Sequence, residues 1–208
     1  MNKLLSKLKL SSFKGKQLYL FLLLVFLVGV LFGSIFITIL DEQDKSTVIT
    51  QIASFFDQIK NNKVDYLNVF KNSVTANLIY IAAIWLLGIS IIGIPIIIMM
   101  LFFKGFMIGF SIAAIIAKYK IIGVLGALTY IFPHIIISVL VIFMLSYYAL
   151  KLSFGLLRAV IERKSINFSE IINRYSFAML LSVIVMIIAS TIETFVSPYI
   201  IKLFLIFT

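Results

Sequence analysis

Long apolar blocks dominate the chain, and polar residues are largely confined to the stretches between them. The blocks cover residues 18–40, 74–103, 105–117, 121–150 and 175–196. A helix needs about 20 apolar residues to cross the hydrocarbon core of a bilayer. Because backbone polar groups in lipid must find their hydrogen bonds within the chain, such blocks predict membrane-spanning helices. The expected fold is therefore an all-α, multi-pass helical membrane bundle with about five spans.

Prolines interrupt two of these blocks. Pro95 lacks a backbone N–H donor and disfavours helix at the residue before it. We therefore expect the block at 74–103 to be kinked or broken around Gly93 and Pro95. By the same reasoning, Pro133 predicts a kink in the block at 121–150.

Two apolar blocks, at 105–117 and 18–40, contain glycines four residues apart. The block at 105–117 is short for a span, so it predicts a tilted span, a half-helix or part of a broken helix that dips back. Gly105 and Gly109 give it a small-residue face. Gly29 and Gly33 form a G-x-x-x-G pair, which can bring two helices together. Since such pairs are frequent in membrane helices, we favour an incidental occurrence at this position.

Charge predicts which side of the membrane each polar stretch occupies. The formal net charge is +10, and residues 1–17 and 151–174 are basic. Lys and Arg are retained on the cytoplasmic side, so we expect both stretches inside. Residues 41–73 carry nearly balanced charge and are expected outside, as is the tail at 197–208. The turn at 118–120 is also expected outside, so its two lysines depart from the rule that Lys and Arg stay on the cytoplasmic side.

The outer stretch at 41–73 predicts an amphipathic helix, since apolar residues recur there at helical spacing. Its apolar face could lie on the outer leaflet, meet a partner or pack on the chain's own spans, and the pattern does not separate these alternatives. We take Ile52, Phe55, Phe56 and Ile59 as the candidate partner-binding face.

Three ionisable residues fall within or beside the apolar blocks, where charge is costly and often functional. Lys104 is expected to extend its long side chain to the inner interface. His134 follows Pro133 and is expected to satisfy backbone that the proline leaves unpaired. Glu193 is expected at the outer interface rather than in a proton relay, with Pro198 bending or ending the last span. Lys104 and Glu193 should therefore form no salt bridge, because a full span separates them.

Composition and motifs exclude several function classes. The chain has no cysteine and one histidine, which excludes disulfides, thiolate metal sites and histidine clusters. It has no H-E-x-x-H, phosphate-binding loop or G-x-S-x-G motif. Its basic residues flank the spans instead of forming a nucleic-acid-binding face. We expect a non-enzymatic membrane protein without cofactor, metal or nucleic acid; the pattern leaves open whether it forms a homo-oligomer.

Four segments together resemble the stage II sporulation protein M family of endospore-forming bacteria. In order they are Gly-Ile-Ser-Ile-Ile-Gly-Ile-Pro at 88–95, Phe-Lys-Gly-Phe-Met-Ile-Gly-Phe at 103–110, Phe-Pro-His at 132–134 and Ile-Glu-Thr-Phe-Val-Ser-Pro-Tyr at 192–199. The basic N-terminus, the outer loop and the order of spans also agree. One departure follows Phe-Pro-His, where isoleucines stand at 135–137 and some wider relatives have Gly and Glu.

The resemblance implies a membrane scaffold that acts during engulfment. Such a protein would work with peptidoglycan hydrolases, the stage II sporulation proteins D and P, and hold them at the septum. It would reside in the bacterial cell membrane, in the mother-cell septal or engulfing membrane. The alternative is a transporter or channel subunit that uses Glu193 in a polar pathway. A polar, water-accessible cavity at mid-membrane would support transport, and a tightly packed apolar bundle would support a scaffold.

The predicted topology is testable with reporter fusions. A reporter that is active only outside the cell should be active when fused after Asn62 or at the C-terminus, and silent after Lys164. Activity of the fusions, normalised to their amount in the membrane, is the measurement. An active fusion after Lys164 would overturn the five-span arrangement.

Overall fold

A computed structural model of the chain describes residues 15–131, 134–162 and 168–205. Within these ranges the chain is helical apart from short connections and contains no strand. The helices are α2 (Gly15–Ile39), α3 (Glu42–Lys60), α4 (Tyr66–Gly88), α5 (Gly93–Tyr119), α6 (Ile122–Ile131), α7 (His134–Glu162), α8 (Phe168–Phe195) and α9 (Ser197–Leu205).

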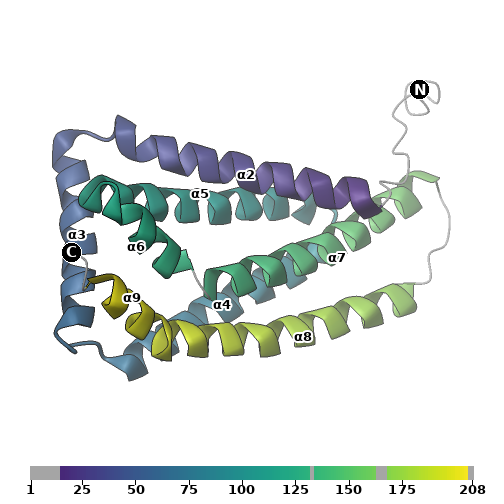
Figure 1. Cartoon of the computed structure of the whole chain (residues 1–208). Coiled ribbons are helices and arrows are strands. Elements are labelled where there is room, and N and C mark those ends of the chain that lie inside the picture. The colour runs from purple at the N-terminus through teal and green to yellow at the C-terminus, as the bar shows by residue number, and fades with distance from the viewer. Residues whose placement is uncertain (1–14, 132–133, 163–167, 206–208) are drawn as a thin grey trace.

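Five helical segments in the described ranges are long and apolar enough to cross a membrane. They are α2, α4, α5, α7 and the segment Ser169–Lys202, which joins α8 to most of α9. These segments run along the bundle, and α3 lies across one end of it (Figure 1). We call the end at α3 the outer end, following the charge pattern. The expected helical membrane bundle is confirmed.

The block at 74–103, expected to be one span kinked or broken around Gly93 and Pro95, is broken there and divided between two antiparallel helices (Figure 1). α4 ends at Gly88 and α5 begins at Gly93, with a turn between them in which the Gly93 N–H bonds to the Ser90 carbonyl at 3.2 Å. A Cβ built at Gly93 would meet the carbonyl oxygen of Leu87, so glycine permits this turn. Pro95 lies in the first turn of α5, where a missing N–H costs nothing.

This division changes the interpretation of the next block. Residues 105–117 form the second half of α5, so they are neither a separate span nor a half-helix. Lys104 consequently lies within a continuous helix, about 16 Å along its axis from Gly93. The expectation that Lys104 ends a span at the inner interface is therefore wrong.

The block at 121–150 is broken into α6 and α7. Pro133, the predicted cause, lies outside the described residues. α6 remains at the outer end against α5 and α9, and α7 starts beside it and runs to the inner end (Figure 1). α7 extends to Glu162, so the basic stretch at 151–174 begins as a continuation of this helix. Between α8 and α9 the helix is also interrupted. Pro198 lies in the first turn of α9, after a turn at Val196.

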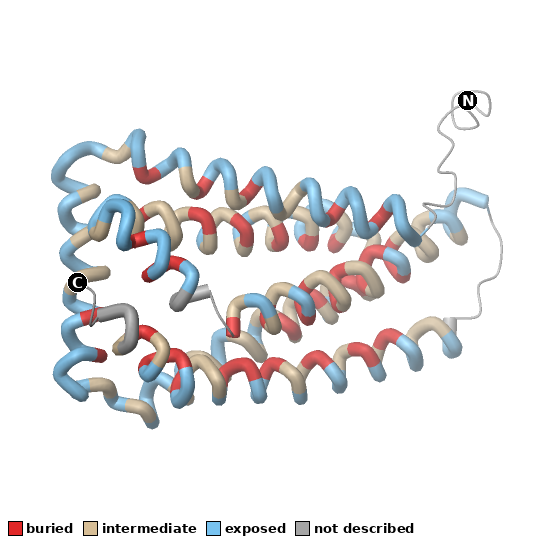
Figure 2. Tube along the Cα trace, viewed as in Figure 1, coloured by how far each residue is buried: buried red, intermediate tan, exposed pale blue. Residues whose placement is uncertain are grey.

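α2 and α5 pack against each other through two pairs of glycines. A Cβ built at Gly29 or Gly33 would meet a backbone carbonyl oxygen of α5, and one built at Gly105 or Gly109 would meet a carbonyl oxygen of α2. The Ser34 hydroxyl adds a hydrogen bond to the Gly109 carbonyl at 3.2 Å. Buried residues accordingly recur along one side of each helix (Figure 2). The G-x-x-x-G pair in α2 is thus a packing motif, which corrects our interpretation of it as incidental.

The inner half of the bundle has an aliphatic core. Its fully buried members come from α2, α4, α5, α7 and α8, and include Leu22, Ile81, Ile84, Ile97, Leu101, Ile142, Leu145 and Met186. Polar contacts fasten the helices at this end. The Tyr175 hydroxyl lies 3.0 Å from the carbonyl oxygens of Ile84 and Trp85, and the Ser153 hydroxyl donates to the Gly88 carbonyl at 2.8 Å.

The glycine contact predicts a position-specific loss of stability. Gly33→Ala and Gly109→Ala each place a methyl group against a backbone that cannot yield locally, so each should destabilise the bundle by about 1–3 kcal/mol. Gly155→Ala is the matched control, because nothing lies within 4 Å of a Cβ built there. The control should be neutral or slightly stabilising. Thermal unfolding of the purified proteins in detergent measures this, and equal effects at all three positions would contradict the packing.

Candidate functional site

A polar cavity of about 250 Å³ lies between α4, α5, α7 and α8. It is lined by Ser73, Ala76, Asn77, Lys104, Met107, Ile108, Ser111, His134, Ile135, Ser138 and Glu193. The structure therefore brings together the three ionisable residues that the sequence analysis singled out. We had placed Lys104 and Glu193 at opposite interfaces, and that expectation is wrong because α5 carries Lys104 outward to the level of Glu193.

Glu193 anchors a hydrogen-bonded network at the outer side of this cavity. The Ser73 hydroxyl donates to Glu193 Oε2 at 2.5 Å and lies 3.0 Å from the Ser190 hydroxyl oxygen. The Asn77 amide donates to Ser190 Oγ at 3.0 Å. His134 Nε2 lies 4.0 Å from Glu193 Oε1. The hydrogen bonds join α4 to α8, and His134 of α7 lies beside them without a hydrogen bond to Glu193.

The partners of Glu193 in this network were not predicted, although their spacing in the sequence carries a signal. Ser73 and Asn77 are four residues apart on α4, and Ser190 and Glu193 are three apart on α8. Residues at these separations share one face of a helix. Small polar residues on the same helical face as a membrane-embedded carboxylate are therefore candidates for its partners.

Lys104 has a different environment from Glu193. Its Nζ lies 5.6 Å from the centroid of the Tyr80 ring, a cation–π contact. The Tyr80 hydroxyl donates to the Met100 carbonyl at 2.6 Å, which holds the ring in place. Among the described residues no ion pair joins Lys104 to Glu193, as predicted, but both residues face one cavity and no span separates them.

The cavity does not continue to the inner end of the bundle. On α5, Ile97 and Leu101 precede Lys104, and on α4, Ile81 and Ile84 follow Asn77, and these four aliphatic residues are fully buried. Buried serines occur in the core, but the described buried residues include no Lys, Arg, Asp or Glu. The inner half is therefore a packed barrier between the cavity and the cytoplasmic side.

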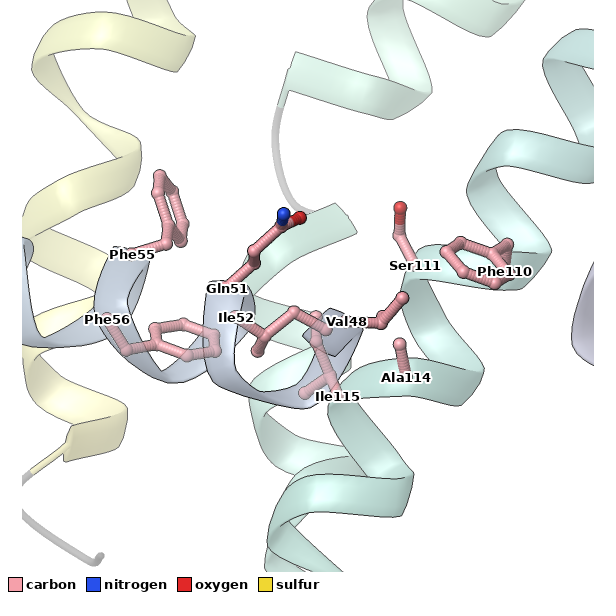
Figure 3. A pocket seen from close by; sticks show the side chains of 9 residues that line it. All are labelled: Val48, Gln51, Ile52, Phe55, Phe56, Phe110, Ser111, Ala114 and Ile115. Atoms are coloured by element: carbon pink, nitrogen blue, oxygen red, sulfur yellow. The ribbon is translucent and has the colours of Figure 1, made fainter. Parts of the chain in front are cut away.

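A second hollow, an apolar groove of about 300 Å³, lies between α3 and α5. Side chains from α3 form one wall and side chains from α5 form the other (Figure 3). Its lining residues are Val48, Gln51, Ile52, Phe55, Phe56, Phe110, Ser111, Ala114 and Ile115. Ser111 lines both this groove and the polar cavity.

The predicted partner-binding face of α3 is largely occupied by the chain itself. Phe56 and Ile59 are 1% and 2% exposed and belong to a cluster with buried residues of α5, α6 and α9. Ile52 packs against the same cluster, whereas Phe55 remains 46% exposed. The apolar face therefore packs mainly on the chain's own helices, and the expectation of a free four-residue face holds only for Phe55.

The glycine contact between α2 and α5 and the polar cavity both fall within one stretch of sequence. The family model described as Stage II sporulation protein M matches residues 22–198, which is most of the chain. The chain belongs to the Stage II sporulation protein M family. Searches of the curated proteins and of the solved structures found no match. As a member of this family, the chain is a sporulation-related membrane protein.

Ser197, His134 and Glu193 lie in the sequence of contacts that a hydroxyl, an imidazole and a carboxylate have in a catalytic triad. The Ser197 hydroxyl lies 3.1 Å from His134 Nδ1, and His134 Nε2 faces Glu193. Ser197, however, is 3% exposed and does not line the cavity, so a substrate cannot reach it there. The carboxylate-to-imidazole distance of 4.0 Å also exceeds a hydrogen bond. We therefore interpret His134 as a residue that ties α7 to the start of α9.

The shared cavity predicts energetic coupling between Lys104 and Glu193. Lys104→Met or Glu193→Gln alone leaves one charge facing the cavity without the opposite charge, so each should lower the thermal unfolding midpoint. The double variant removes both charges. Its loss of stability should be smaller than the sum of the losses of the two single variants, by about 0.5–3 kcal/mol. Lys71→Met, at an exposed position on α4, is the control and should show no coupling with Glu193→Gln. Strict additivity for the first pair would contradict a shared site.

Proposed function

We propose that this chain is a non-enzymatic membrane scaffold of the septal peptidoglycan-degrading machinery during engulfment. In this proposal it holds wall hydrolases, the stage II sporulation proteins D and P, at the septum. It would do so in the mother-cell membrane, with α3 facing the wall. Membership of the family supports a sporulation role, and the position of α3 is the observation that carries the rest.

α3 is fixed to the bundle rather than tethered by flexible segments. Phe56 and Ile59 are buried against neighbouring helices, and Lys202 donates a hydrogen bond to the Asn62 side chain just after α3 ends. A surface that is already ordered loses little conformational entropy when a partner binds. α3 therefore presents a fixed surface at the outer end of the bundle, which is what a scaffold for wall-facing enzymes requires.

The outward side of α3 is polar, with one aromatic residue at its edge. Its exposed members include Gln43, Thr47, Thr50, Ser54, Asp57 and Gln58. Phe55 is exposed beside them and also lines the apolar groove. Partially exposed aromatic residues next to a hollow are typical anchors of protein interfaces. Phe55 is thus the residue of the original four that remains available to a partner.

A transporter or channel subunit is the second candidate, and the charged cavity is the observation that favours it. Transporters place ionisable residues in polar cavities near broken helices, as here beside the start of α7. The packed inner half opposes a continuous pathway in this conformation. The scaffold proposal needs no such pathway, so we place it first.

Two neighbouring phenylalanines distinguish partner binding from folding. Phe55→Gln should reduce co-purification of the wall hydrolases from sporulating cells and leave the thermal midpoint unchanged, because Phe55 is exposed. Phe56→Gln is the matched control: it should lower the midpoint, because it buries an amide in an apolar cluster. Co-purified hydrolase per membrane-inserted chain is the measurement. Undiminished capture by Phe55→Gln would remove Phe55 from the interface, and absence of the hydrolases from the unmodified protein would refute the scaffold.

A further inference from the structure

The polar cavity holds two opposite charges that face the same space and do not touch. Lys104 enters from α5 and Glu193 from α8, and among the described residues no ion pair joins them. Neither the scaffold proposal nor the packing of the bundle requires this arrangement. A membrane protein that needed the two residues only for stability would be expected to pair them directly.

Both charged groups retain unused hydrogen-bonding capacity toward the cavity. In the described part of the chain, the Lys104 ammonium has its contact with the Tyr80 ring and no hydrogen-bond acceptor. Glu193 Oε2 accepts a hydrogen bond from Ser73, whereas Oε1 has the His134 ring at 4.0 Å and, among the residues that the structure describes, no donor at hydrogen-bond distance. The cavity therefore offers one cationic donor and one anionic acceptor, both available to an occupant.

We propose that the cavity binds a small zwitterion of the amino-acid type, with its carboxylate at Lys104 and its ammonium group at Glu193. A lone anion would be attracted by Lys104 but repelled by Glu193. A lone cation would be attracted by Glu193 but repelled by Lys104. A zwitterion satisfies both charges at once, and Asn77, Ser111 and Ser138 add neutral hydrogen-bonding groups to the wall. The volume of about 250 Å³ is slightly below the usual range for drug-sized ligands, which favours a small molecule.

The rim of the cavity indicates the direction of entry. Met107 is 63% exposed, and Ala76 is also exposed, so the opening lies between α4 and α5. The aliphatic core closes the inner side, which leaves entry from the outer half of the membrane. The ligand would therefore come from outside the cell. This proposal rests on the cavity and is independent of the scaffold role.

The test is ligand-dependent thermal stabilisation of the full-length chain in detergent, in a buffer without zwitterions. Glycine, alanine, acetate and methylammonium are compared at equal ionic strength. At about ten times its Kd, a zwitterion should raise the unfolding midpoint by about 3 °C or more. Acetate and methylammonium should give no saturable shift. Lys104→Met and Glu193→Gln should each abolish the response to alanine, whereas Lys71→Met should retain it.

Each alternative result is decisive against the proposal. No saturable shift with glycine or alanine overturns it, and so does an equal shift with acetate, which would indicate a simple anion site. A shift that persists in Lys104→Met places the ligand elsewhere. If stabilisation appears only in bilayers containing phosphatidylethanolamine, the occupant is a lipid headgroup and not a soluble zwitterion. Should either variant fail to fold, the four-ligand series on the unmodified protein still decides the outcome.

Discussion

The backbone contact between α2 and α5 is the constraint on which the rest of the structure depends. Gly105 and Gly109 must face α2, because any larger residue there would meet its carbonyl groups. Successive residues of a helix are about 100° apart, so fixing this stripe also fixes its neighbours. Lys104, Ile108 and Ser111 are thereby turned toward α4, α7 and α8, where they line the cavity. The position of the charged site thus follows from a packing requirement on the adjacent face of α5.

The two halves of the bundle meet the demands of the membrane differently. Among the described residues, the buried core of the inner half contains no Lys, Arg, Asp or Glu, and its polar contacts include bonds to backbone carbonyls, such as those of Tyr175 and Ser153. The outer half tolerates Lys104 and Glu193 because hydroxyl, amide and aromatic groups surround them. A charged pocket backed by a packed aliphatic barrier has the form of a binding site rather than a conduit. This asymmetry is compatible with a scaffold that also recognises a small external ligand.

The sequence predicted the all-α bundle and its five spans, because block length and bilayer thickness are directly related. It predicted a kink or break around Gly93 and Pro95 but not that the chain turns back there into a second span, since the turn between α4 and α5 consists largely of isoleucines and Ile92 is 75% exposed. Hydropathy therefore marks no boundary there, and the lone charge of Lys104 was taken for one. Likewise, the apolar spacing on α3 predicted a buried face at Phe56 and Ile59, but periodicity cannot say which surface buries it. Both errors concern tertiary contacts, which local pattern does not encode.

The polar cavity and the apolar groove between α3 and α5 are not independent parts of the molecule. Ser111 lines both the polar cavity and the groove beneath α3, so one turn of α5 forms a wall of each. A ligand in the cavity can alter partner binding at α3 only if it favours one arrangement of that turn over another. Where it does, linkage requires the converse: a bound partner must change the affinity of the cavity for its ligand by the same factor. A scaffold built in this way would hold its partner most firmly when the cavity is in the matching state, and α5 would carry that coupling.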